Sequence, residues 1–161
     1  MIRLILAFCL FSGLLQAQES DFIRESYNNI AKSYENLSAD DMLRHYGNNS
    51  AVFRSNKSNF IQVYYSNDEI FKYFSDEFKL LVKGKKRMAC TIKISETRRQ
   101  DNVIYVSGFQ NLEISNESGN INNDTGAFSH VWNFENNEWK LQVDSLIPVS
   151  QEEFEKAVSR N

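Results

Sequence analysis

Apolar residues near the start of the chain recur at intervals of three and four, which is typical of an amphipathic helix. The pattern predicts a helix over residues 20–36 with one polar side. Its apolar positions are Phe22, Ile23, Tyr27, Ile30, Ala31, Tyr34 and Leu37. Another element must cover this apolar side, so the helix is expected to pack against the rest of a folded domain.

Two further helices are predicted by capping signals that precede apolar residues. Ser38 and Asp41 have capping-box spacing and start a short second helix that runs through Tyr46. Ser66 starts a third helix, which ends near Gly84. The apolar stripe of the third helix consists of Ile70, Phe71, Phe74, Phe78 and Leu81.

Elsewhere the apolar pattern changes to a period of two, which is typical of strands. Residues 51–53 and 60–65 are rich in β-branched and aromatic side chains and predict two short strands. Residues 88–95 and 103–115 predict two longer strands, and the alternation slips around Gly108. A bulge is therefore expected near this glycine.

The last third of the chain predicts a hairpin and a short helix. A polar loop at 116–126 is followed by a hairpin over residues 127–147, and Ser150 caps a terminal helix. Helices, a strand pair, a helix and then a bent four-stranded antiparallel sheet form an α+β order. The short connections between the strands exclude a parallel sheet.

The expected pairing of the hairpin decides which side chains face the core. With Asn136 and Asn137 as the turn, His130 faces Val143. The inner, apolar face then carries Phe128, His130, Trp132, Phe134, Trp139, Leu141, Val143 and Ser145. On this register Asp144 points to the opposite face, so the inner face of the last strand carries no acid.

The first residues have the features of an export signal. Arg3 precedes an apolar run from Leu4 to Leu15, and Ala17 is a small residue suited to signal-peptidase cleavage. The run is shorter than the roughly 20 residues of a membrane-spanning helix. We expect residues 1–17 to be a signal peptide, residues 18–161 to form one domain without a membrane span, and the protein to be secreted or periplasmic.

Charge and cysteine content limit the partners and the chemistry. The net charge is −3, and the one basic cluster, residues 83–87, resembles a solvated end of an element, so no nucleic-acid partner is expected. After cleavage Cys90 is the only cysteine, which excludes an internal disulfide. Cys90 alternates with apolar residues and is expected to be a core residue.

Three stretches resemble the NTF2-like superfamily, in particular its secreted SnoaL-like or DUF4440-type proteins. They are ADDMLRHYGNNSAVF (39–53), SNDEIFKYFSDEF (66–78) and HVWNFENNEWKLQVDS (130–145). The resemblance implies a cone in which a curled antiparallel sheet wraps around the N-terminal helices, with a pocket at the open end. It also implies that homodimers across the sheet are common. Enzymes and binding modules share this fold, so the resemblance leaves the activity open.

His130 is the central candidate for a site, either as a core histidine with a hydrogen-bond partner or as a pocket residue that contacts a ligand or a proton. His45 is expected at the surface. Asp41 is a candidate for proton transfer or for the capping box of the second helix, and the capping role is the expected one. Two distant histidines lack metal-ligand spacing, so neither a metal nor a cofactor is expected. The candidate pocket residues are Tyr34, Tyr64, Tyr105, Phe128, His130, Trp132 and Trp139.

Two functions are consistent with these candidate pocket residues. The first is a non-enzymatic exported domain that binds a small apolar ligand or forms a homodimer, which the aromatic wall favours. The second is an isomerase, dehydratase or hydrolase with His130 as its general base.

Overall fold

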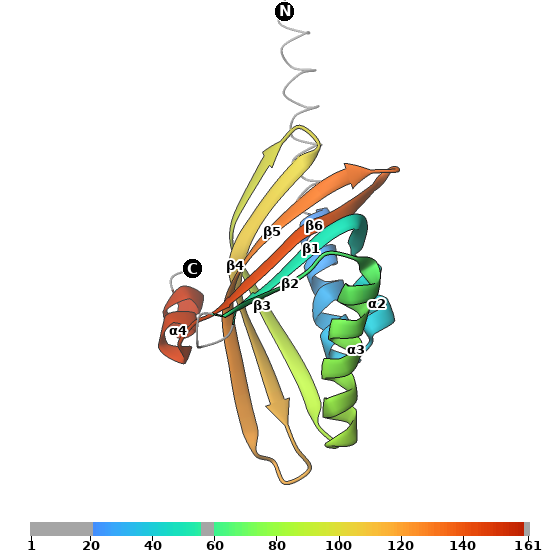
Figure 1. Cartoon of the computed structure of the whole chain (residues 1–161). Helices are drawn as coiled ribbons and strands as arrows, with labels where there is room; N and C mark the ends of the chain where they lie inside the picture. Colours follow the sequence, from blue (N-terminus) through green and yellow to red (C-terminus); the bar gives the residue numbers. More distant parts are fainter. Residues whose placement is uncertain (1–20, 56–59, 160–161) are drawn as a thin grey trace, which may run out of the picture.

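A single curled sheet of six strands, in the order β2-β1-β6-β5-β4-β3, forms the frame of the protein (Figure 1). The computed structural model describes residues 21–55 and 60–159. The expected signal peptide, residues 1–17, lies outside the described residues. The α+β class predicted from the sequence is confirmed.

Helices cover both sides of the sheet. Residues 21–35 are helical and lie with α2 and α3 on the inner face, whereas α4 lies on the outer face (Figure 1). The elements are α2 (Ala39–Leu43), β1 (Tyr46–Ser55), β2 (Ile61–Tyr64), α3 (Asn67–Lys83), β3 (Arg87–Gln100), β4 (Val103–Ser115), β5 (Ile121–Glu135), β6 (Glu138–Pro148) and α4 (Gln151–Ser159).

Capping side chains fix the helix starts where the sequence places them. Ser66 is the N-cap of α3, and its hydroxyl accepts a hydrogen bond from the backbone N–H of Glu69 at 3.2 Å. Ser150 and Glu153 form a reciprocal capping box at α4. These bonds satisfy backbone donors that a helix start otherwise leaves unpaired.

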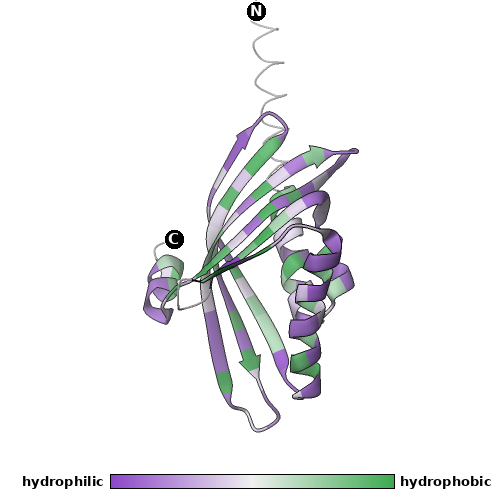
Figure 2. Cartoon of the chain, in the orientation of Figure 1, coloured by the Kyte–Doolittle hydropathy of each residue, from purple (hydrophilic) through white to green (hydrophobic). Residues whose placement is uncertain are grey.

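The core lies between the inner face of the sheet and the three helices that cover it. Apolar and polar residues alternate along the strands, as the hydropathy colouring of Figure 2 shows. The largest fully buried side chains are Trp132, Phe74, Met42, Ile70, Ile104, Leu141, Val52 and Val106. They come from α2, α3 and four strands, so one core holds the whole fold together.

Strand β1 differs from its prediction in two ways. The second helix ends at Leu43, and Tyr46 begins β1 instead of ending the helix. In addition, β1 pairs with β6 in parallel, so the expectation of no parallel pairing is wrong for this pair. Strands β2 to β5 and helix α3 lie between these two strands in the sequence, and short-range signals do not reveal a pairing over this separation.

The polar loop predicted at 116–126 is also shorter than expected. Ile121 already pairs with Ser115, and the β4–β5 ladder continues through the Asn-rich segment. The side-chain amide of Asn111 donates to Asn123 at 3.1 Å across the two strands. Cross-strand pairing thus outweighs the low strand propensity of asparagine.

The bulge expected near Gly108 lies in the neighbouring strand. The register of β3 shifts between Ile94 and Glu96, directly opposite Gly108 and Ser107 of β4. A Cβ on Gly108 would lie 2.1 Å from the backbone oxygen of Lys93 and 2.8 Å from the Phe128 ring. Glycine is therefore required here by the close approach of two neighbours.

Candidate functional site

A second bulge brings an unexpected acid into the core. Asn136 and Asn137 have positive φ values and form the predicted turn, but the register of the hairpin shifts between Val131 and Trp132. His130 therefore pairs with Asp144 instead of Val143, and the expectation that Asp144 points outward is wrong. One extra residue in β6 reverses the face of every residue that follows it.

Asp144 accepts hydrogen bonds from two side chains of strand β1. Arg54 donates from its two terminal nitrogens, at 2.7 Å to Oδ1 and 2.6 Å to Oδ2. The hydroxyl of Tyr46 donates to Oδ2 as well. The side chains of Arg54 and Asp144 are only 10% and 7% exposed, so this bidentate ion pair is shielded from solvent.

The imidazole of His130 continues this network toward the first helix. Its Nε2 lies 3.3 Å from Oδ1 of Asp144, and its Nδ1 lies 2.8 Å from the hydroxyl of Tyr27. The indole N–H of Trp132 in turn donates to the Tyr27 oxygen at 3.3 Å. Both nitrogens of the His130 ring therefore face protein groups.

The charges fix the direction of these bonds. Burial by itself raises the pKa of the Asp144 carboxyl, but Arg54 and His130 hold that pKa well below its usual range. An ionised carboxylate favours a proton on the facing Nε2, which leaves Nδ1 to accept from Tyr27. Burial raises the pKa of Tyr27 far above its ordinary value, so Tyr27 keeps its proton.

A small cavity borders this network. Its volume is about 10 Å³, which is room for about one water molecule. It is lined by Ile30, Tyr34, Met42, His45, Tyr46, Gln110, His130, Leu141 and Asp144. A small apolar ligand does not fit in this cavity.

Three of the seven predicted pocket residues meet in the core beside Tyr27. Phe128 and His130 stack on each other at 4.4 Å between ring centroids, and both rings stack on Tyr27. Trp132 meets Tyr27 edge-on. Tyr34 lines the same cavity as His130. The inward direction predicted for His130 and Trp132 agrees with their burial.

The other three predicted residues lie elsewhere. Tyr64 of β2 stacks on Tyr73 of α3 at 4.7 Å. Trp139 stacks on Phe22 near the turn of the hairpin. Tyr105 lies on the outer face of the sheet and is 44% exposed, so it is not part of an interior wall.

His45 is half-buried and lines the cavity, so the predicted surface position is wrong. Burial, with the charge of Lys140, lowers the pKa of His45 to about 4. Asp41 has the predicted capping position, since its backbone N–H donates to Ser38. Cys90 is half-buried, and burial raises the pKa of its thiol to about 12. Such a thiol is unreactive at neutral pH.

The sequence prediction missed Tyr27, Arg54, Tyr46 and Asp144. Tyr27 was assigned to the apolar side of the first helix, and its hydroxyl gave no separate signal. Arg54 directly follows the predicted strand at 51–53, where an inward-facing charge needs a partner of opposite sign. This requirement for a buried acid was the one signal that could have placed Asp144 inside.

Neither a metal-ligand cluster nor a membrane-spanning helix is present in the part of the chain that the structure describes. Residues 21–55 and 60–159 contain no group of three or more His, Cys, Asp or Glu side chains that could hold a metal ion. Among the helices within these ranges, none has the length and apolar character needed to cross a membrane.

Solved structures share this architecture at low sequence identity. An NTF2-like protein of unknown function from Shewanella oneidensis has a TM-score of 0.64 and 14% identity, over 80% of this chain and 98% of that one. A candidate dehydratase of the NTF2-like family from Streptomyces avermitilis has a TM-score of 0.65 and 8% identity, over 84% and 99%.

A third structure is named for association. It is a candidate calcium/calmodulin-dependent protein kinase type II association domain from Thiobacillus denitrificans, with a TM-score of 0.63 and 14% identity over 78% of this chain and 93% of that one. No protein-family model and no curated protein matches the sequence. The chain has the NTF2-like fold, and at these identities the likeness concerns the fold alone.

Proposed function

We propose that this chain is an exported, non-catalytic NTF2-like domain that forms a homodimer through the outer face of its sheet. The cavity of about 10 Å³ beside His130 is the observation that carries this proposal. It is too small for the apolar ligand that an aromatic interior would otherwise suit. Of the two non-enzymatic roles, assembly therefore has the better support.

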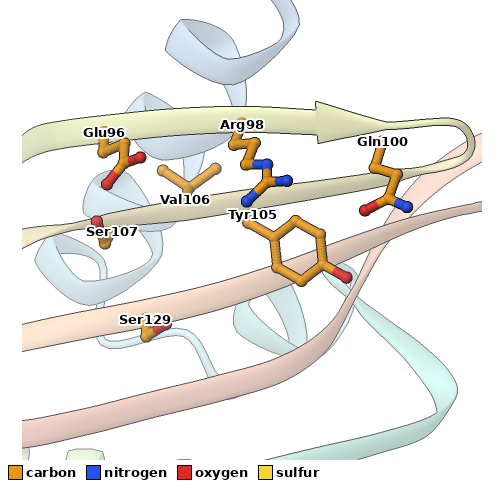
Figure 3. Close-up of a pocket in the computed structure, with 7 residues that line it drawn as sticks. All are labelled: Glu96, Arg98, Gln100, Tyr105, Val106, Ser107 and Ser129. Carbon is orange, nitrogen blue, oxygen red and sulfur yellow. The ribbon is translucent and has the colours of Figure 1, made fainter.

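The outer face carries a groove of about 340 Å³ across three strands (Figure 3). Its floor includes Ser107 and Ser129, which pair across β4 and β5. Tyr105 stands beside these small side chains and is 44% exposed. In a dimer with a two-fold axis, the Tyr105 ring of each copy can fill the groove of the other copy.

Charge also suits a second copy of the chain on this face. Glu96 and Arg98 lie two residues apart in β3, and both line the groove. Opposite charges on one face can pair with their counterparts in a two-fold related molecule. The similar structure from Thiobacillus denitrificans is described as a candidate association domain, which is in keeping with an assembly role.

One structural observation supports the enzyme hypothesis and another opposes it. The 3.3 Å contact between His130 and Asp144 supplies the acid–base pair that the predicted register lacked. However, the Nδ1 of His130 is occupied by Tyr27, and the carboxylate of Asp144 is bound by Arg54 and Tyr46. A general base needs reach to its substrate. We therefore keep catalysis by His130 as the second candidate.

Sedimentation equilibrium of residues 18–161 tests the dimer. We expect a dimer for the wild type and at least tenfold weaker association for Tyr105→Arg, because a charge would be buried in the groove. Leu80→Arg on α3, 65% exposed and on the helix-covered side, is the matched control and should dimerise normally. A monomeric wild type at all concentrations would contradict the proposal.

Export has its own test. The apolar run up to Leu15 and the small residue Ala17 support cleavage after residue 17. Mass spectrometry of the protein from the periplasm or medium of a secreting host should give a mature chain that begins at Gln18. Retention of the full-length chain in the cytoplasm would contradict export.

A further inference from the structure

Two buried polar side chains at the cavity lack a hydrogen-bond partner among the residues that the structure describes. Gln110 is 5% exposed and Tyr34 is 6% exposed, and both line the cavity. Within residues 21–55 and 60–159, no hydrogen bond joins the amide of Gln110 or the hydroxyl of Tyr34 to another residue, and both side chains border the cavity. Leaving such groups unpaired in the interior is costly, so they need another partner.

We propose that this cavity binds one ordered water molecule that bridges Tyr34 and Gln110. Its volume of about 10 Å³ holds about one water, and a buried water requires two to four polar partners. The Tyr34 hydroxyl can donate to the water, and the Gln110 amide can both accept and donate. Tyr46 donates its own proton to Asp144, so its oxygen remains free to accept from the water.

The surrounding charges favour a neutral occupant. Asp144 is the carboxylate among the lining residues, and it is already paired with Arg54 at 2.6 and 2.7 Å. A cation would thus find no free negative charge, and an anion would be repelled by Asp144. Since His130 and Asp144 already have protein partners, neither is available to take a proton from this water. The water is structural, not a nucleophile.

The proposal explains a polar residue at an otherwise apolar position. Gln110 lies on the inner face of β4, where Ile104, Val106 and Leu112 are its buried neighbours in alternation. An apolar side chain there would leave Tyr34 with an unpaired hydroxyl. A glutamine instead lets the water connect the first helix to the sheet.

A crystal structure that resolves ordered water, together with water relaxation dispersion in solution, tests the site. We expect one water within hydrogen-bond distance of the Tyr34 hydroxyl and the Gln110 amide. The double variant Tyr34→Phe/Gln110→Met should lose one long-lived water, whereas the control Tyr64→Phe, whose ring lies outside the cavity, should keep it. An empty cavity, or a direct bond between Tyr34 and Gln110, would overturn the proposal.

Unfolding in urea gives a second readout that does not need crystals. Tyr34→Phe and Gln110→Met should each lower the midpoint, and the double variant should lower it by less than the two shifts combined. The two side chains would be coupled through the water that they share. Strictly additive shifts would contradict a shared water, even where all three variants fold.

Discussion

Asp144 lies directly opposite His130 in the β5–β6 ladder, with its Oδ1 3.3 Å from the ring Nε2. The pair is separated from the strand turn by a bulge, and the same carboxylate anchors Arg54 of β1. One buried acid therefore connects β1, β5 and β6. The stability of the fold should depend on it more than on any surface charge.

Removing the charge of Asp144 should be strongly destabilising. Asp144→Asn leaves Arg54 as a buried, uncompensated cation, and we expect a loss of about 3–5 kcal/mol in the free energy of unfolding. Urea denaturation measures this loss. Asp76→Asn is the matched control, because Asp76 pairs with Lys72 on the exposed side of α3 and should change little. Equal effects of both substitutions would refute the role of Asp144.

The free energy of unfolding should decrease as the pH is lowered, in two successive pH windows. The folded-state pKa of His45 is lowered to about 4 from an ordinary value of 6.5, so the unfolded chain binds an extra proton between these values. The contribution of His45 is complete above about pH 6.5 and is lost toward pH 4. The Asp144 pKa is also lowered, so its contribution is lost only below the ordinary carboxyl pKa of 3.8.

Thermal melts from pH 7 down to below 3.8 cover both windows. His45→Gln should flatten the decline between pH 6.5 and 4, because the substituted residue no longer titrates. The decline at lower pH should remain, since Asp144 is still present. If His45→Gln follows the same curve as the wild type, another group causes the decline.

Replacing His130 distinguishes its two possible roles. In a structural role, His130→Ala leaves the Tyr27 hydroxyl without its partner and should destabilise the protein by about 1–3 kcal/mol or more. In a catalytic role, turnover should fall about a hundredfold while stability is unchanged. Asn122→Ala, at an exposed position of the same strand and outside the groove, is the control. We expect the structural outcome.

Gly108 should tolerate no larger residue. In Gly108→Ala the new Cβ would meet a backbone oxygen and the Phe128 ring, and overpacking of this kind costs about 1–3 kcal/mol. Calorimetry measures the change. Gly84→Ala, where the nearest contact is 3.3 Å, should have the smaller effect. A neutral Gly108→Ala would mean that β3 and Phe128 can move apart.

The helices and the fold class could be predicted because their signals are local. The stripe of α3 and the serine caps depend on residues three or four positions apart, and the Asn136–Asn137 turn depends on two. The inward direction of His130 followed from simple alternation. Its partner could not be predicted, because one bulged residue in β6 gives no sequence signal and reverses the faces beyond it.

Contacts between residues far apart in the sequence could not be predicted from local patterns either. Arg54 and Asp144 are 90 residues apart, and they meet only because β1 joins β6 in parallel. Tyr105 lies on the outer face because of the register in which β4 pairs with β3 and β5. His45 was placed at the surface because its neighbour Arg44 is charged, whereas the first helix covers it.

The parallel contact of β1 with β6 also sets the order of events during synthesis. A ribosome-bound chain that lacks residues 138–148 has no central strand to hold β1 in the sheet and no counter-ion for Arg54. Native docking of the amino-terminal third must then wait until the last strand emerges. Until that moment β1 lacks its neighbour in the sheet and Arg54 lacks its carboxylate.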